Sequence, residues 1–264
     1  MLYFVATPIG NLKGITLEAL EVLSSVDFVY AENPRHSLTL LNYHEIKKTV
    51  LSYERHSEKI KSSEIVKKLK NGKMVAVVSD AGTPLISDPG SVLVQELIKH
   101  DLPFTLVGST CAAINALVVS GLDTSSFTFV GFLPNKQKDK LQLINKFSKL
   151  ECTLIFYIAV HDVMKELEFL HKNLGVRKVA LVREISKKFE EVKRFELGQQ
   201  IDFTQKGEFV LVVESYKKEK VCQSHIPIRI KELLKQGISK KEISKILAIE
   251  FEMSSSEIYS KIHE

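Results

Sequence analysis

The sequence predicts an α/β protein with two α/β domains followed by a small helical segment. Three features of the chain support this prediction. Short apolar runs alternate with amphipathic stretches over residues 2–120, which is typical of strands and helices built around a parallel sheet. A segment that contains Gly121, Gly131 and Pro134 interrupts the alternation at residues 121–134, and the pattern of residues 226–263 is almost purely helical. We therefore predict domains at residues 1–120, 121–218 and 219–264.

The first predicted domain alternates strands with helices. The strands are short apolar runs, and the helices are amphipathic or rich in small residues. Thr16 can cap the first helix, and Asn71–Gly72 marks a turn before the third strand. We expect strands at residues 2–5, 26–31, 74–79 and 104–107, and helices at residues 17–23, 57–69, 91–100 and 112–120. Such alternation predicts a parallel sheet with helices on both faces.

The second predicted domain contains more strands and fewer crossover helices. Gly121, Gly131 and Pro134 surround one strand-like run at residues 128–130, and we interpret this segment as the connection between the domains. Beyond it we expect helices at residues 136–149 and 162–173, and strands at residues 153–157, 179–183, 192–197 and 209–213. The shortage of crossover helices predicts a mixed sheet.

The last segment contains two capping-box patterns. Ser239 with Glu242 and Ser254 with Glu257 each predict the start of a helix, and Gly237 marks a turn. Three short helices with tight turns resemble a helix-turn-helix. Two interpretations remain open: contact with nucleic acid, or a small packing or dimerisation appendage.

Composition indicates an ordinary globular protein. Of the 264 residues, 44% are hydrophobic and 26% are charged, so the chain can bury a core. The net charge of +5 is compatible with an RNA partner and also with an ordinary lysine-rich surface. An odd number of scattered cysteines (Cys111, Cys152 and Cys222) argues against a disulfide framework and against a metal site, and fits the cytoplasm. We expect no signal peptide and no membrane span.

The segments that follow three predicted strands favour a ligand site. Residues 6–11, 80–90 and 108–113 are rich in Gly, Pro and small side chains, and ligands of open α/β sheets bind at strand ends. Simple turn chemistry would explain one such loop, but three at successive strand ends favour a site. The motifs GxxxxGK[ST], GxGxxG, HExxH and GxSxG do not occur, which weakens ATP, dinucleotide, metalloenzyme and hydrolase interpretations.

Six motifs of the chain stand out together. The longest is Val-Ser-Asp-Ala-Gly-Thr-Pro-Leu-Ile-Ser-Asp-Pro-Gly at residues 78–90, and the others lie at residues 2–16, 131–134, 154–157, 207–213 and 238–242. In this order they resemble the ribosomal RNA small subunit methyltransferase I family, a branch of the tetrapyrrole-methylase-type methyltransferases. The resemblance implies two α/β domains of the tetrapyrrole methylase type with S-adenosylmethionine held between them, and a homodimer. It also implies 2′-O-methylation of a cytidine in 16S ribosomal RNA near the decoding centre, so the expected partner is the small ribosomal subunit.

The resemblance also implies the residues of the site. A ribose hydroxyl is a poor nucleophile until its proton leaves, so a base or a strong hydrogen-bond acceptor helps. The candidate catalytic residues are Glu32, Asp80 and Arg35. The candidate cofactor-binding residues are Pro8, Ile9, Asp80, Gly82, Thr83, Ile86, Ser87, Cys111, Ala112, Tyr157, Val182 and Phe209.

Several of these residues have a structural alternative. Glu32 can act as a base, orient Arg35, or serve as a helix-terminal charge paired with Arg35. Asp80 can bind the cofactor or hold the turn that follows it. Tyr157, Val182 and Phe209 can wall the donor or fill the core. Asp88 is expected to cap the helix beginning near Ser91, and Arg35, His36 and Arg183 are candidate phosphate contacts.

The chain departs from the family at three motifs. Ala-Glu-Asp-Thr-Arg-His becomes Ala-Glu-Asn-Pro-Arg-His at residues 31–36, and Pro-Gly-Pro-Ser-Ala becomes Gly-Ser-Thr-Cys-Ala at residues 108–112. Glu-Ser-Pro-His-Arg becomes Ile-Ala-Val-His-Asp at residues 158–162. Two other functions therefore stay open: methylation of a tetrapyrrole or another small molecule, and a binding protein impaired in catalysis.

Overall fold

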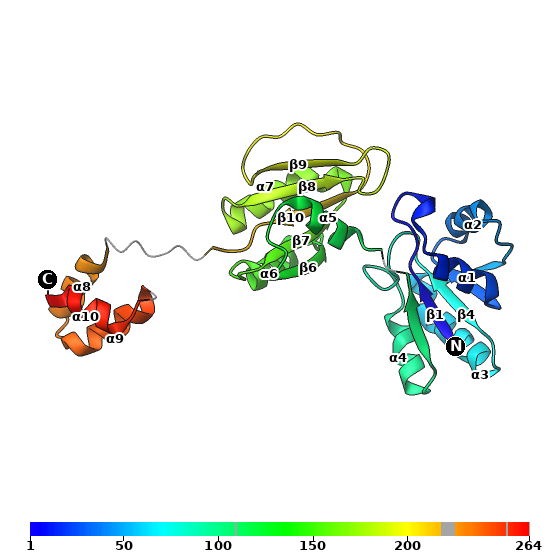
Figure 1. Cartoon of the computed structure of the whole chain (residues 1–264), viewed down its shortest axis with the longest axis horizontal. Coiled ribbons are helices and arrows are strands. Elements are labelled where there is room, and N and C mark those ends of the chain that lie inside the picture. The colour runs from blue at the N-terminus through cyan, green and yellow to red at the C-terminus, as the bar shows by residue number, and fades with distance from the viewer. Residues whose placement is uncertain (109, 218–224, 252, 264) are drawn as a thin grey trace. The chain divides into compact units, whose positions relative to one another are not determined.

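The computed structural model describes residues 1–108, 110–217, 225–251 and 253–263. The chain forms two units, Met1–Tyr216 and Lys217–Glu264 (Figure 1). Within the described ranges, none of the helices has the length and apolar character needed to cross a bilayer. The predicted boundary between residues 218 and 219 lies outside the described residues, as does Cys222, and so it stays a prediction.

The first sheet has five parallel strands in the order β3-β2-β4-β1-β5. Alternate strand residues point to opposite faces, so Val5 and Val78 join one core cluster while Phe4 and Val77 join another. Helices α1 and α2 cover the first face, and α3 and α4 cover the second. The predicted parallel sheet with helices on both faces is therefore confirmed. The strands are β1 (Leu2–Val5), β2 (Phe28–Ala31), β3 (Val50–Ser52), β4 (Val75–Val78) and β5 (Phe104–Val107); the helices are α1 (Leu17–Ser25), α2 (Pro34–Tyr43), α3 (Glu58–Lys70) and α4 (Ser91–Lys99).

Two elements of this half escape sequence prediction. Helix α2 contains as much polar as apolar sequence and buries only Ser37, Leu40 and Leu41. Its start is set by Asn33, whose side chain accepts a hydrogen bond from the backbone N–H of His36, and by Pro34 in the first turn. Strand β3 has only three residues, all partly buried, which is too short for a pattern with period two.

The second sheet is mixed, as the sequence predicts, with the order β6-β7-β10-β8-β9. Strands β6 and β7 pair in parallel, and the other pairs are antiparallel. Helices α6 and α7 cover one face. The elements are β6 (Phe127–Phe132), α6 (Gln137–Phe147), β7 (Thr153–Ile158), α7 (Val163–Leu174), β8 (Lys178–Arg183), β9 (Glu191–Glu196) and β10 (Phe209–Val213).

The segment interpreted as a connection between domains is in fact part of this sheet. Residues 127–132 form the edge strand β6, with an irregularity between Phe129 and Gly131 where the register shifts. Gly131 has a φ of 75°, a conformation that glycine adopts without the steric cost of a Cβ. The glycine therefore marks a bulge in the strand rather than the end of structure.

Helix α5 (Ala112–Ser120) lies between the two sheets in sequence but packs against the second one. Its Ala113, Ala116 and Leu117 share a core cluster with Ile155 of β7 and Val212 of β10. The predicted boundary after residue 120 would assign this helix to the first domain. Both sheets belong to one unit, and the division at residue 121 stays a prediction.

The C-terminal unit contains α8 (Ile226–Lys235), α9 (Lys240–Glu250) and α10 (Ser255–His263). Ile226, Leu233, Ile243 and Ile258 belong to its own buried core. Both predicted capping boxes are present. The side chains of Ser239 and Ser254 accept from the backbone N–H three residues ahead, and Glu242 and Glu257 accept in return.

Candidate functional site

Three loops meet at the carboxyl ends of β1, β4 and β5. The backbone N–H groups of Thr7 and Gly82 each donate to the other residue's carbonyl oxygen at 2.9 Å, which joins the first loop to the second. The Thr83 hydroxyl donates to the Thr110 carbonyl at 2.8 Å, which joins the second loop to the third. The buried Ser79 hydroxyl donates to the Gly82 carbonyl at 2.6 Å. The Gly- and Pro-rich segments of the sequence therefore form one connected surface.

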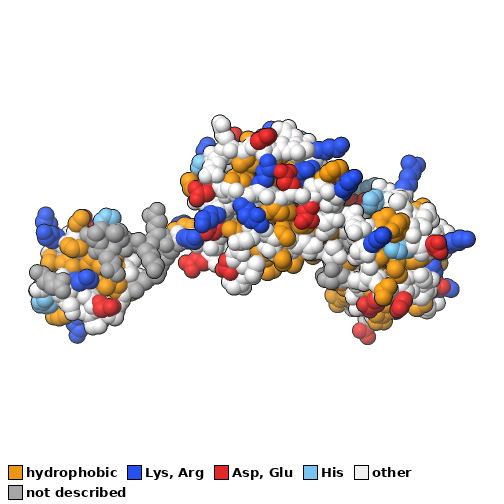
Figure 2. All heavy atoms as spheres, turned by 45° about the horizontal axis from the view of Figure 1, so that its top comes forward, with side chains coloured by type: hydrophobic (Ala, Val, Ile, Leu, Met, Phe, Trp, Pro, Cys, Tyr) orange, Lys and Arg blue, Asp and Glu red, His pale blue; other side chains and the backbone are white. Residues whose placement is uncertain are grey.

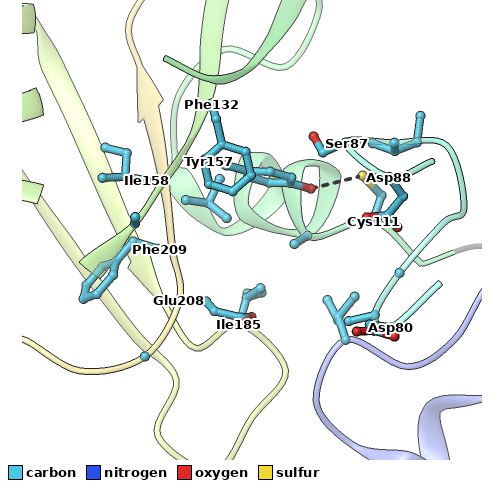
Figure 3. A pocket seen from close by; sticks show the side chains of 18 of the residues that line it. Asp80, Ser87, Asp88, Cys111, Phe132, Tyr157, Ile158, Ile185, Glu208 and Phe209 are labelled. Carbon is cyan, nitrogen blue, oxygen red and sulfur yellow. Dashed lines mark hydrogen bonds between the residues drawn. The ribbon is translucent and has the colours of Figure 1, made fainter. Parts of the chain in front are cut away.

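This surface forms one side of a cavity of about 440 Å³, here called the main cavity (Figure 3). Its volume lies in the range of cavities that hold small molecules, roughly 300–1,000 Å³. Strands of the second sheet and the segments around them form the other side. The lining residues are Ile9, Asp80, Ala81, Gly82, Thr83, Ile86, Ser87, Asp88, Cys111 and Ala112 from the first half, and Phe132, Tyr157, Ile158, Ala159, Val160, His161, Ile185, Gly207, Glu208, Phe209 and Val210 from the second.

The wall from the second sheet is aromatic and apolar. The rings of Phe132 and Tyr157 lie with centroids 5.4 Å apart, inclined by 63°, and the Tyr157 hydroxyl is 3.8 Å from the Cys111 sulfur (Figure 3). Burial raises the pKa of the Tyr157 phenol far above its usual range, so this group stays neutral. Ile158 and Phe209 add buried apolar surface. Such a wall suits a flat aromatic group.

The loop from Asp80 to Gly90 is held in an unusual backbone conformation. Leu85 and Ser87 have φ angles of 72° and 70°, which cost non-glycine residues about 1–3 kcal/mol each. Gly82 has a φ of 85°, and a Cβ there would lie 3.2 Å from the Thr110 carbonyl oxygen. The Arg55 guanidinium donates to the Ser87 carbonyl at 3.0 Å. Contacts from outside the loop therefore fix where its side chains point.

Carboxylates gather beside this loop. One oxygen of Asp80 accepts from the backbone N–H of Asn33 at 3.1 Å, which links the ends of β2 and β4. Asp88 lines the main cavity and also a small second cavity, lined in part by Glu32. Burial, together with the negative charges of Glu32 and Asp80, raises the pKa of Asp88 to about 6, against the opposing effect of Arg55.

The predicted capping role of Asp88 is wrong. Glu58 of α3 caps α4 instead, because one of its carboxylate oxygens accepts from the backbone N–H groups of Gly90 and Val92 at 2.8 and 3.0 Å. Gly90 stands at the N-cap position and α4 has no cap from its own neighbouring side chains. Asp88 is left facing the cavities, and this carboxylate has no hydrogen-bond partner in the part of the chain that the structure describes.

The structure places most of the predicted cofactor-binding residues on the main cavity. The exceptions are Pro8, which is not part of the lining, and Val182, which is fully buried in the core cluster that contains Tyr157. The residues brought together there are Ile9, Asp80, Gly82, Thr83, Ile86, Ser87, Cys111, Ala112, Tyr157 and Phe209. Their roles toward a ligand remain predictions.

The predicted catalytic residues do not all meet at one place. Asp80 lines the main cavity, Glu32 lines the small one, and Arg35 is exposed near the start of α2. Among the described residues, Glu32 forms no ion pair with Arg35. Arg183, a predicted phosphate contact, pairs with Glu191 at 3.1 Å.

Most lining residues that the sequence did not single out come from the second half. Ile158, Ala159, Val160 and His161 belong to a motif in which the chain departs from the family, and Gly207, Glu208 and Val210 belong to a motif in which it agrees. The agreeing motif could have signalled these last three. Phe132 lies in the 131–134 motif, where the chain also agrees with the family, so that motif could have signalled it. Ile185 follows two residues after the end of β8 and gives no distinct signal.

The departures have local explanations. Asn33 provides the cap of α2, and Asn and Asp are about equally good in that position, so the change leaves the helix start intact. Ile158 replaces an expected carboxylate with a buried apolar wall residue. Ser109, in the departing motif at residues 108–112, lies outside the described residues.

Comparison with known proteins agrees with this architecture. Residues 1–200 match the family described as Tetrapyrrole (Corrin/Porphyrin) Methylases. The ribosomal RNA small subunit methyltransferase I of Pasteurella multocida is 39% identical over 258 residues, which cover 94% of this chain and 91% of that protein. Among solved structures, diphthine synthase has a TM-score of 0.65 at 15% identity, covering 81% of this chain and 89% of the other.

A second solved structure shares the fold and contains a ligand. It is the uroporphyrin-III C-methyl transferase of Thermus thermophilus complexed with S-adenyl homocysteine, with a TM-score of 0.57 at 17% identity, covering 80% of this chain and 96% of the other. At this identity the likeness extends to the fold alone. The family match and the P. multocida relative together show that the chain belongs to the tetrapyrrole methylase family, in its ribosomal RNA small subunit methyltransferase I branch.

Proposed function

We propose that the protein transfers a methyl group from S-adenosylmethionine to the 2′-hydroxyl of a cytidine in 16S ribosomal RNA near the decoding centre. The observation that carries the proposal is the main cavity, because the 78–90 motif of the family forms one side of it without a departure. The family branch supports ribosomal RNA as the acceptor. The cytidine and its position follow from the resemblance of the motifs.

The residues of the main cavity fit the donor. Its aromatic and apolar wall around Tyr157 and Phe132 suits an adenine ring, and its volume of about 440 Å³ suits a molecule of this size. Asp80 and Asp88 provide negative charge that favours a cationic ligand. When bound, the donor supplies an already activated methyl group, so the protein mainly has to position the two reactants.

The proposed catalytic residues act on the acceptor and on the shape of the site. Asp80 fixes the end of β2 against the end of β4 through its hydrogen bond to Asn33. Arg35 is exposed near the first turn of α2, where it can reach an RNA phosphate. Glu32 directly precedes Asn33 in the sequence and adds negative charge beside Asp88.

The RNA contact extends beyond the cavity. The segment from residue 217 onward carries more Lys and Arg than Asp and Glu, and its three helices keep their own core. We assign RNA binding to this unit in preference to a packing role. On the face shown in Figure 2, Lys and Arg side chains are spread among acidic ones, which supports several separate phosphate contacts rather than one dense patch.

We also propose that the enzyme acts in the cytoplasm as a homodimer. Strand β5 is an edge strand of the first sheet, and its Phe104 and Leu106 are 38% and 50% exposed. An edge strand with exposed apolar residues is a common place for pairing with another chain.

The test is a methyl-transfer assay with radiolabelled donor and small ribosomal subunits that lack the modification. We expect one methyl group per subunit, located on a cytidine ribose, and no transfer to subunits already modified. Tetrapyrrole in place of the subunits serves as the competing acceptor. Label on the tetrapyrrole and none on the RNA would overturn the proposed acceptor, and binding of donor without any transfer would indicate a binding protein.

A further inference from the structure

Asp88 has the position of a reactive group rather than a structural one. It is the second Asp of the 80–90 loop, and it lines the main cavity (Figure 3). It also lines the small cavity beside Glu32. The residue is partly buried, and its carboxylate makes no hydrogen bond within the described residues. A partly buried carboxylate without hydrogen-bond donors destabilises the fold. Its presence in a cavity therefore indicates a functional reason for keeping it.

The surroundings of Asp88 are mostly acidic or neutral. Arg55 is the cation that acts on it, and the same guanidinium already donates to the Ser87 carbonyl. Glu32 and Asp80 repel its charge, and Tyr157 faces it across the main cavity with a phenol that stays neutral. The other titratable groups that line the two cavities are Tyr53, Cys111, His161 and Glu208.

These surroundings make Asp88 a stronger base than an ordinary carboxylate. Burial and the two neighbouring negative charges raise the pKa of its side chain to about 6. It is still ionised at neutral pH, and general bases work best when their pKa lies near the working pH. Perturbed carboxylates that line a cleft are frequent at catalytic sites.

We propose that Asp88 is the catalytic residue that accepts the proton of the attacking ribose hydroxyl. The inference rests on the proposed function. The hydroxyl oxygen forms a bond to the methyl carbon, the carbon–sulfur bond breaks, and its electron pair stays on sulfur as a neutral thioether. The hydroxyl proton passes to a carboxylate oxygen of Asp88, so charge and atoms balance.

The neighbouring carboxylates are less suited to this role. One oxygen of Asp80 is held by the backbone N–H of Asn33, so it is partly engaged in fixing the loops. Glu32 lines the small cavity and not the main one. Asp88 is the carboxylate that borders both spaces and has no donor bonded to it in the described chain.

The first test compares Asp88→Asn with the wild type and with Asp101→Asn, an exposed change in a turn where Asn is well tolerated. Single-turnover methyl transfer to unmodified subunits is measured from pH 5 to pH 8.5. The wild-type rate should rise about tenfold per pH unit and level off above about pH 6, since Asp88 acts in its ionised form. Asp88→Asn should be about 100-fold slower or more and lose that rise, while Asp101→Asn matches the wild type.

A second readout does not involve turnover. Because the pKa of Asp88 is raised in the folded state, the protonated form stabilises the fold at low pH, and that contribution is lost as the pH rises toward about 6. Asp88→Asn imitates the protonated form. Its thermal midpoint should therefore exceed that of the wild type at pH 8 and equal it at pH 4.

The outcomes separate the two claims. If the wild type transfers methyl groups and Asp88→Asn keeps the same rate and pH profile, the proposed role of Asp88 is overturned. The proposed function stays intact in that case. Absence of transfer by the wild type would overturn the proposed function, and the role of Asp88 with it. An Asp88→Asn variant that melts lower than the wild type at pH 8 would show a structural role and contradict the inference.

Discussion

Replacing Glu58 should destabilise the loop that forms one side of the main cavity. Glu58 is 8% exposed, and one of its oxygens accepts from the backbone N–H of Gly90, from that of Val92 and from the Tyr53 hydroxyl, at 2.8, 3.0 and 3.3 Å. The first two donors belong to the start of α4. Glu58→Ala removes all three hydrogen bonds at once. The two backbone donors lose their acceptor, while the Tyr53 hydroxyl keeps the Ser62 hydroxyl as a partner at 3.3 Å.

The expected loss of stability follows from these contacts. A buried donor left without a partner costs about 1–3 kcal/mol, and loss of a cap costs about 1 kcal/mol. Part of this cost is recovered where water reaches the helix end, so we expect about 2–4 kcal/mol for Glu58→Ala. For a unit of this size each kcal/mol lowers the thermal midpoint by about 2–4 °C, which gives a decrease of about 5–15 °C. Glu58→Gln keeps an oxygen acceptor and should lose only about 1 kcal/mol.

The assay is thermal unfolding at pH 7.5 followed by circular dichroism. The control is Glu21→Ala. Glu21 is exposed on α1, so this substitution also removes a carboxylate but breaks no buried contact. If the thermal midpoints of the Glu58→Ala and Glu21→Ala variants agree within about 1 °C, the reasoning that Glu58, and not Asp88, holds the start of α4 is refuted.

Three further predictions concern the site and its surroundings. Gly82→Ala should weaken donor binding about tenfold in calorimetry, because a φ of 85° and a Cβ 3.2 Å from the Thr110 carbonyl oxygen force the loop to move. The control is Gly14→Ala, where a Cβ meets nothing within 4 Å, and this variant should bind the donor normally. Removal of residues 217–264 should slow methylation of subunits by about tenfold or more while donor affinity stays unchanged, since that unit has its own core; equal rates would contradict the proposed RNA contact. Leu106→Lys should convert a dimer into a monomer in light scattering, because it places a charge on an exposed edge strand, and an unchanged mass would exclude this edge as the interface.

The fold could be predicted where local sequence and tertiary packing agree. The strands β1, β4 and β10 are short apolar runs buried in the structure, and both capping boxes of the C-terminal unit form as their side chains indicate. Strand β6 was missed in part because the bulge at Gly131 looks like a turn in the sequence. Helix α2 was missed because its apolar stripe is narrow and its capping residue, Asn33, stands in a motif that attracted a functional interpretation.

The candidate site could be predicted only in its first half. The loops after β1, β4 and β5 lie at the carboxyl ends of neighbouring parallel strands, and this arrangement brings Ile9, Thr83 and Ala112 together. The position of Asp88 depends on Glu58, which lies about 30 residues earlier and takes over the helix cap. No local sequence pattern indicates that a residue so far away provides the helix cap in place of Asp88. Nor does a local pattern indicate that the second sheet forms the other wall of the main cavity.

The most direct test of the central claim is a crystal structure of the protein with S-adenosylhomocysteine. We predict that the ligand occupies the main cavity, with its adenine ring against the wall that contains Tyr157 and its amino acid end beside the loop that contains Asp80. A ligand bound elsewhere, or a cavity filled by the protein's own side chains under saturating ligand, would contradict the assignment of this cavity as the methyl-donor site.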